Sequence, residues 1–352
     1  MPDARVQAAI DNWGPRFITN GVDYNVFVRT TRGLEHWEDW LDAWSGAAEV
    51  HLEIAAQAEA AGHALTAGEA YVSAATCFHF AKFVWVVDAE KNRATTRRAI
   101  DALARAHRLL DPTAERLEVP FEGTTLAANL RHPTGVQRAP LVVLIPGLDS
   151  TKEEFFGWEN VFLQRGIATL SFDGPGQGES GFELPIRHDY DVPVGALLDH
   201  VADRTDLDHD RIGAVGVSMG GYYAPRAAAF EKRIKAVAGI SGPYTMGSNW
   251  DDLPNVTRET LMHHTHAADH DEARERTLKL DLTGVAELID QPSLILTGKL
   301  DRLIPWEQTK RIADEAQDST WVLFDDGTHV CNNVPYKYRN LVGDWTQEQL
   351  GR

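Results

Sequence analysis

The pentapeptide Gly216-Val217-Ser218-Met219-Gly220 constrains the fold of this chain more than any other feature. It fits the pattern G-x-S-x-G, and its surroundings add weight: the apolar run RIGAVGV leads into it and the helix-forming run GGYYAPRAAAF leads out of it. Strand, sharp turn and helix form the setting in which such a serine is exposed, because small neighbours let a strained turn project the hydroxyl. The alternative is a glycine-rich turn with a buried serine.

Short apolar runs alternate with amphipathic helices after Pro112. The predicted strands are 117–120, 125–131, 141–145, 168–172, 212–217, 236–240, 293–297 and 321–324. The predicted helices are 153–164, 194–204, 219–232, 307–316 and 338–349. Uninterrupted apolar strands such as LVVLI favour a parallel sheet covered on both faces. The alternation therefore predicts a doubly wound α/β domain with a mostly parallel eight-stranded sheet.

The first part of the chain has a helical pattern instead, with dense alanine and with Trp and Phe at three- and four-residue spacing. Thr66 and Glu69 fit a capping box that would start a helix running toward Val86, and a second helix is expected over 95–110. The aromatic residues around Trp40 and Phe80 favour helical-core packing over a pocket lining. We therefore predict a helical N-terminal domain over 1–115 and a catalytic domain over 116–352, with a lid insertion at about 244–289.

A serine hydroxyl is a weak nucleophile until a base removes its proton. Two residues further along the chain fit the required roles: Asp301 follows the strand SLILTG, and His329 follows the strand WVLFDD. Both stand at carboxyl ends of predicted parallel strands, where catalytic loops of such sheets converge. Taken singly, Asp301 could be a helix cap and His329 a surface histidine. In this order after the serine, they predict a Ser218–Asp301–His329 triad.

An oxyanion hole needs two backbone amides aimed at the developing negative charge. The amide of Met219, directly after the serine, is the first candidate. The second is the amide of Leu148, just after the strand LVVLI, where Gly147 would permit a close approach of the backbone.

The charge balance excludes several classes of partner. The chain has 34 Lys and Arg against 52 Asp and Glu, a net charge of −18, so binding to nucleic acid or an anionic membrane surface is not expected. The two cysteines, Cys77 and Cys331, do not make a disulfide framework. The first residues carry no apolar signal core and no stretch is long enough to span a bilayer, so we expect a cytoplasmic protein.

The motifs PGLDSTKEE, SFDGPGQGES, GVSMGG, TGKLDRLIP and GTHVCNN together resemble one group within the α/β-hydrolase superfamily. This group contains 2,6-dihydroxypseudooxynicotine hydrolase, fungal polyketide-shortening hydrolases and FrsA-like esterases. The resemblance implies Ser218, Asp301 and His329 as the triad, and the N-terminal helices as a cap and homodimer contact. It also implies hydrolysis of an acyl carbon–carbon bond. Members with that activity add an acidic group after the sixth strand, where this chain reads Ser248-Asn249-Trp250-Asp251-Asp252.

Three functions remain in order of preference. The first is hydrolysis of a carbon–carbon bond in a small aromatic or polyketide-like substrate of β-diketone or aryl ketone type, through an acyl-enzyme. The second is a carboxylesterase or thioesterase with the same triad. The third is a non-catalytic binding protein of the same fold. The partner is a small acyl compound in the first two cases, and no cofactor or metal is expected.

Three further sequence patterns each have a functional interpretation and a simpler structural one. His263, His264, His266 and His270 have spacing that a metal site could use, but a solvated lid helix explains them as well. Cys331 lies two residues after His329, and a packing role is more common for cysteine than reactivity. The run from Asp173 to Gly178 lacks the spacing of a phosphate-binding loop, and we interpret it as the loop after the fourth strand, with Asp173 in a structural role.

Overall fold

Residues 3–351 are described by a computed structural model, and their contacts divide the chain into two compact units. The first contains the described residues up to Ala114 together with a short later segment, Glu153–Gly157. The second contains Glu115–Lys152 and the described residues from Trp158 onward. The return of Glu153–Gly157 to the first unit is not visible in the sequence pattern. That the first unit acts as a cap and dimer contact stays a prediction.

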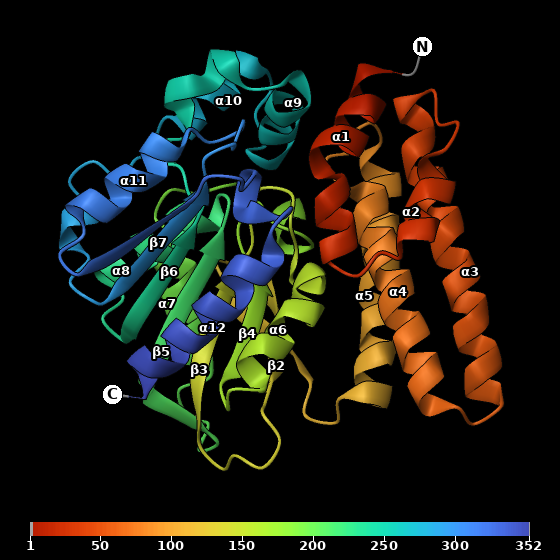
Figure 1. The fold of residues 1–352 in the computed structure, drawn as a ribbon, viewed down its shortest axis with the longest axis horizontal. Helices are drawn as coiled ribbons and strands as arrows, with labels where there is room; N and C mark the ends of the chain where they lie inside the picture. The colour runs from red at the N-terminus through yellow and green to blue at the C-terminus, as the bar shows by residue number, and fades with distance from the viewer. Residues whose placement is uncertain (1–2, 352) are drawn as a thin grey trace. The chain divides into compact units, whose positions relative to one another are not determined.

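The first unit is helical and is coloured red to orange in Figure 1. Its elements are α1 (Ala4–Thr19), α2 (Tyr24–Thr31), the 3-10 turn η1 (Trp37–Asp39), α3 (Trp40–Ala60), α4 (Ala64–Lys82) and α5 (Ala89–Leu110). Aromatic rings fill its core: Phe17 stacks on Phe80 with ring centres 3.9 Å apart and contacts Trp40 and Trp44. All four side chains are fully buried, which confirms the prediction of helical-core packing.

In this unit, three helix boundaries differ from the sequence-based prediction. The capping box at Thr66 is wrong, because Gly62 has a positive φ of 77° and reverses the chain at once, so α4 already begins at Ala64. At its other end α4 stops at Lys82 instead of reaching Val86. The next helix, α5, begins six residues before the predicted 95, because the Asp88 carboxylate accepts the amides of Glu90 and Lys91.

The second unit is built on an eight-stranded sheet within residues 3–351, ordered β1-β2-β4-β3-β5-β6-β7-β8. The strands are β1 (Glu115–Phe121), β2 (Thr124–Arg131), β3 (Ala139–Ile145), β4 (Ala168–Asp173), β5 (Leu207–Val217), β6 (Ile234–Ile240), β7 (Ser293–Gly298) and β8 (Ser319–Phe324). Pairings of β2 with β1 and with β4 are antiparallel and all others are parallel. The prediction of a mostly parallel α/β sheet is confirmed.

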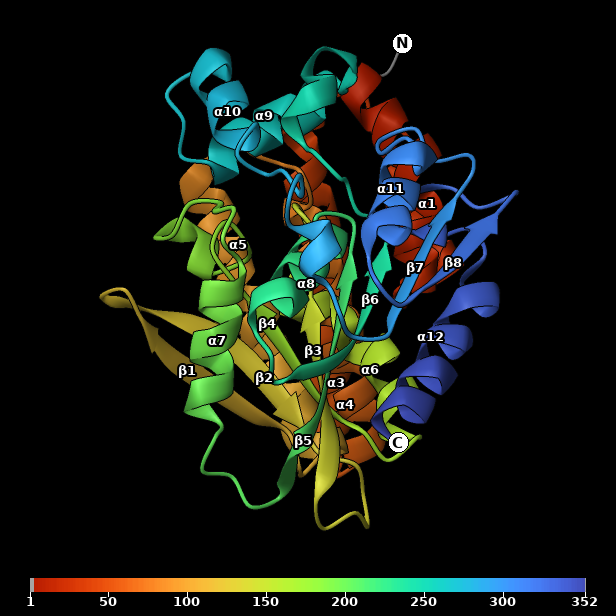
Figure 2. The same ribbon diagram turned by 90° about the vertical axis from the view of Figure 1, so that its left-hand side faces the viewer.

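Helices cover both faces of this sheet, with α6 and α12 on one side and α7 and α8 on the other (Figures 1 and 2). Their bounds are α6 (Phe156–Leu163), α7 (Asp191–His200), α8 (Gly220–Phe230), α11 (Trp306–Glu315) and α12 (Pro335–Leu350). Between β6 and β7 the chain forms η4 (Gly247–Asp252), α9 (Asn255–His264), α10 (His270–Thr277) and η5 (Ala286–Leu288). Short 3-10 segments η2 (Lys152–Phe155), η3 (Ser180–Phe182) and η6 (His329–Cys331) complete the described elements.

Within the part of the chain that the structure describes, no helix combines the length and the apolar character that crossing a bilayer requires.

Candidate active site

The serine of the G-x-S-x-G motif stands in a strained turn between β5 and α8. Ser218 has a positive φ of 56°, and its amide donates to the Ile240 carbonyl at 2.8 Å. A Cβ at position 220 would lie only 2.1 Å from the Ile145 carbonyl oxygen, and one at position 216 only 1.8 Å from the Gly220 carbonyl oxygen. Both glycines are therefore required for the turn to pass this close to its neighbours, and the turn holds Ser218 out of the sheet.

Three side chains from three different strand ends meet at this turn. The His329 Nε2 lies 2.8 Å from the Ser218 Oγ, and the His329 Nδ1 lies 2.7 Å from the Asp301 Oδ2. The Asp301 side chain is fully buried, whereas 15% of the His329 side chain is exposed. The arrangement is a continuous hydrogen-bonded chain from a buried carboxylate to a hydroxyl, the geometry in which an imidazole can take the hydroxyl proton.

The loops that carry Asp301 and His329 are themselves fixed by hydrogen bonds. The Asp301 Oδ1 accepts the amides of Leu303 and Ile304 at 2.9 and 3.0 Å, so its Oδ2 is directed at the imidazole. The amide of Val330 donates to the Ser241 Oγ at 3.0 Å, and this hydroxyl also bonds the Thr297 hydroxyl. Ser241 lies at the end of β6, and its role in holding the histidine loop has no recognisable sequence pattern.

Both backbone segments that carry the predicted oxyanion amides lie next to Ser218. Met219 follows it directly at the start of α8, and Gly147 brings the other loop into contact, since a Cβ at position 147 would lie 2.9 Å from the Ser218 Cβ. Among the described residues, none accepts a hydrogen bond from the amide of Leu148 or of Met219. Two amides without acceptors beside a nucleophile can bind an oxyanion.

The acidic residues of the segment after β6 do not lie at the triad. Asp251 pairs with Arg274 with 74% of its side chain exposed, and Asp252 is also exposed. Asn249 instead approaches the Asp301 loop, with its Nδ2 donating to the Leu303 carbonyl at 3.5 Å. A carboxylate from this segment therefore supplies no charge to the site in this structure.

The weaker candidates have local roles. Burial, with smaller contributions from Asp301 and Asp326, raises the pKa of the Cys331 thiol to about 12, so it is not a reactive thiolate. In the segment between β6 and β7, the His266 ring contacts the Gly181 carbonyl at 2.8 Å, and His263 and His264 pack edge to face. His270 packs against Trp250.

A mostly parallel eight-stranded sheet with a serine in a strained strand–helix turn defines an α/β hydrolase. More narrowly, the chain belongs to the FrsA-like esterase family, whose pattern matches residues 27–285.

Full-length relatives place the chain within that family. It is 34% identical over 341 residues to 2,6-dihydropseudooxynicotine hydrolase of Paenarthrobacter nicotinovorans, covering 96% of this chain and 92% of the relative. The crystal structure of 2,6-dihydroxy-pseudo-oxynicotine hydrolase superposes with a TM-score of 0.88 at 33% identity, covering 96% of each chain. Fungal relatives match in part: 20-hydroxy-prefusarin hydrolase FUS2 of Gibberella moniliformis is 34% identical over 64% of this chain and 55% of its own length. The predicted resemblance is confirmed.

Proposed function

We propose that this chain is a serine hydrolase that cleaves an acyl carbon–carbon bond in a small aromatic or polyketide-like ketone. The observation that carries the proposal is the hydrogen-bonded chain from Asp301 through His329 to Ser218 beside two amides without acceptors. The likeness to a pseudooxynicotine hydrolase over nearly the whole chain supports a ketone as the substrate class.

The first half of the reaction forms an acyl-enzyme. Ser218 Oγ attacks the substrate carbonyl while His329 Nε2 takes the hydroxyl proton, and Asp301 stabilises the imidazolium. The amides of Leu148 and Met219 bind the oxyanion. When the tetrahedral intermediate collapses, the carbon–carbon bond breaks, its electron pair passes to the departing carbon, and His329 returns the proton there.

The second half releases the acid. Water attacks the acyl-serine with His329 as the base, and the same amides bind the second oxyanion. The departing carbon must carry negative charge for a moment, which it can do only when conjugation spreads that charge. This requirement limits the substrates to β-diketones and to aryl ketones such as ortho- or para-acylphenols, which meet it through the keto tautomer of the ring, because cleavage of that tautomer leaves the charge on the phenol oxygen. An ester places the same charge on oxygen, so the triad would hydrolyse an activated ester as well.

Carboxylester hydrolysis is the second candidate, and one observation favours it: the carboxylates of Asp251 and Asp252 are exposed, so the segment after β6 adds no acid for protonating a carbon.

A substrate panel separates the two. Purified enzyme and its Ser218→Ala variant are given p-nitrophenyl esters, acylphenols and β-diketones, and the products are identified by mass spectrometry. We expect both ketone classes to be cleaved to an acid with kcat/KM at least equal to that for the esters, and Ser218→Ala to be inactive. Turnover of esters with intact ketones would assign the chain to the esterases.

A further inference from the structure

Two loops at the carboxyl ends of β3 and β4 are joined by a buried glutamine. We call residues 146–152 the oxyanion loop, because it carries Leu148, and residues 173–180 the β4 loop. Gln177 of the β4 loop is 1% exposed, and its Nε2 donates to the Pro146 carbonyl at 2.5 Å and to the Gly147 carbonyl at 3.0 Å. Both acceptors belong to the oxyanion loop.

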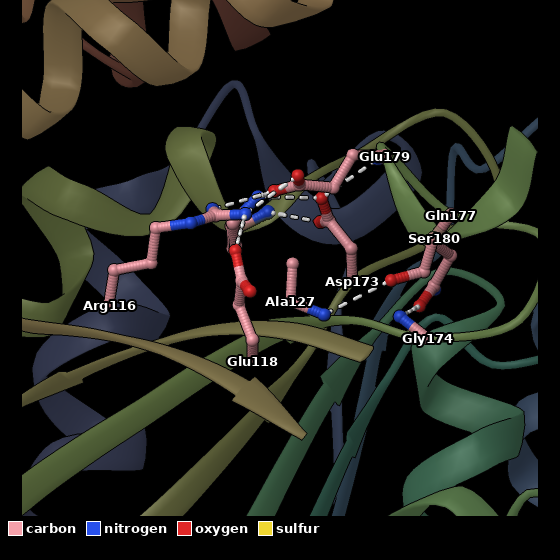
Figure 3. Close-up of polar contacts among 9 residues, drawn as sticks. Arg116, Glu118, Ala127, Asp173, Gly174, Gln177, Glu179 and Ser180 are labelled. Atoms are coloured by element: carbon pink, nitrogen blue, oxygen red, sulfur yellow. Dashed lines mark hydrogen bonds and ion pairs between the residues drawn. The ribbon is translucent and has the colours of Figure 1, made fainter. Parts of the chain in front are cut away.

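The other end of the Gln177 amide is held just as firmly. Its Oε1 accepts the Gly174 amide at 3.1 Å and the hydroxyl of Tyr190, a fully buried residue. Figure 3 shows the Gln177 side chain and Gly174 in this arrangement. A Cβ at position 174 would lie 1.9 Å from the Tyr190 hydroxyl, so only glycine lets the loop pass here. The two acceptor contacts fix which end of the amide faces the oxyanion loop.

A second connection closes the far end of the oxyanion loop. Asp173 accepts the Lys152 amide on Oδ1 and the Lys152 Nζ on Oδ2, both at 2.9 Å. The Lys152 Nζ also pairs with Glu179 at 2.6 Å, and Arg116 pairs with Glu179 in turn (Figure 3). Burial raises the pKa of Glu179, but the cations of Lys152 and Arg116 lower it by more, so the carboxylate stays charged.

The contact between Gln177 and the Gly147 carbonyl also affects the Leu148 amide, because both groups belong to one peptide unit. The Gly147 carbonyl and the Leu148 N–H belong to the same planar trans peptide, so they point in opposite directions. A donor that fixes the carbonyl also fixes the direction of the N–H. It polarises the peptide as well, which makes the N–H a stronger donor.

We propose that Gln177 is a positioning residue that aims the Leu148 amide at the oxyanion, with Tyr190 fixing the orientation of Gln177. This inference rests on the proposed function, because it assigns a role within the same reaction. Gln177 does not touch the reacting atoms; it acts through the Gly147–Leu148 peptide.

The test is the rate at which an alkyl fluorophosphonate modifies Ser218, because the phosphonyl oxygen must enter the same oxyanion hole. Gln177→Leu keeps the bulk and removes both donors. We expect its second-order labelling rate to fall about 10- to 100-fold, below the loss of about 10²–10³ for removing an oxyanion donor outright. The kcat on a p-nitrophenyl ester should fall by the same factor, with KM within about twofold.

A matched control separates aiming from general packing. Gln291 is 8% exposed and its Nε2 donates to the Ala228 carbonyl at 2.8 Å, so Gln291→Leu removes a comparable buried bond. We expect this control to lose stability without losing labelling rate. Tyr190→Phe, which removes one hydroxyl, should lower the rate by a smaller factor and serves as the test if Gln177→Leu does not fold.

The outcomes are distinct. If folded Gln177→Leu and Tyr190→Phe are labelled at the wild-type rate, or if Gln291→Leu slows as much as Gln177→Leu, the inference is wrong. If folded wild-type enzyme is not labelled on Ser218, the proposed function itself fails, and the inference falls with it.

Discussion

Each unit of the molecule contains a histidine paired with a buried carboxylate, and the two pairs differ in what surrounds them. In the helical unit the His79 Nε2 lies 3.1 Å from a Glu154 oxygen, both side chains are at least 95% buried, and Arg16 also bonds Glu154. In the sheet unit the imidazole of His329 bonds buried Asp301 on one side and Ser218 on the other. The first pair is closed off from solvent, whereas the second adjoins a serine hydroxyl, and we expect a structural role for the first and a catalytic role for the second. We call them the enclosed pair and the open pair.

The pKa shifts of Glu154 and His79 favour one charge state for each residue near neutral pH. Burial raises the pKa of Glu154, but Arg16 and His79 lower it by more, so its pKa lies well below the usual value. Burial lowers the pKa of His79, and its pairing with Glu154 only partly opposes this. Both shifts favour a structural contact whose residues do not exchange protons near neutral pH.

Removing the acid of the open pair should have the largest effect. Asp301→Asn keeps the shape but leaves the imidazole in the wrong tautomer, so we expect kcat to fall about 10⁴-fold. Ester hydrolysis under saturating substrate measures it. Asp344→Asn, an exposed carboxylate paired with Arg165, is the control and should retain full activity. A loss below about tenfold for Asp301→Asn would contradict the role of Asp301.

Breaking the enclosed pair should cost stability instead. Glu154→Gln removes the buried carboxylate that the Arg16 guanidinium bonds at 2.7 Å, so we expect the free energy of unfolding to drop by about 3–5 kcal/mol. Urea unfolding followed by tryptophan fluorescence measures it. Asp42→Asn breaks an exposed pair with Lys91 and should cost only about 0–1 kcal/mol. Equal losses in the two variants would contradict the prediction that the buried Arg16–Glu154 pair contributes more to stability than the exposed Lys91–Asp42 pair.

The same pair should make the protein sensitive to acid. The pKa values of Glu154 and His79 are both lower in the folded chain, so the unfolded chain binds more protons and stability falls as pH falls. The loss due to His79 begins near its ordinary value of 6.5, and that due to Glu154 begins near 4.5. Melting temperatures of wild type and His79→Gln between pH 4 and 8 check this. The variant should show a flatter curve between pH 5 and 7, and parallel curves would count against the assignment.

The smallest effect is expected at Cys331, two residues after His329. With a pKa of about 12, the Cys331 thiol is protonated at neutral pH, so iodoacetamide should leave it unmodified in the folded enzyme. Cys331→Ala should keep kcat within about twofold. Rapid alkylation of Cys331 with loss of activity would show that the thiol takes part in the site.

The sheet and the candidate site were predictable because their signals are local. Ser218, Asp301 and His329 each follow an apolar strand, and parallel topology brings strand ends together. The supports of the site were not predictable: Gln177 and Ser241 act through contacts between loops that are distant in sequence.

The helical unit was predictable in class but not in detail. Its alanine-rich aromatic pattern indicated helices, yet the start of α4 depends on the reversal at Gly62 and that of α5 on the cap at Asp88. Glu154 lies in a stretch that reads as part of a helix in the sheet domain, and only the folded structure shows it paired with Arg16.

If Asp301 and His329 make Ser218 a nucleophile, treatment with an alkyl fluorophosphonate must modify this residue, and intact-mass spectrometry detects the adduct. We predict one added phosphonyl group per wild-type chain, mapped to the peptide that contains Ser218, and none in folded Ser218→Ala. An adduct on another residue, or an unmodified wild-type chain, would contradict the assignment.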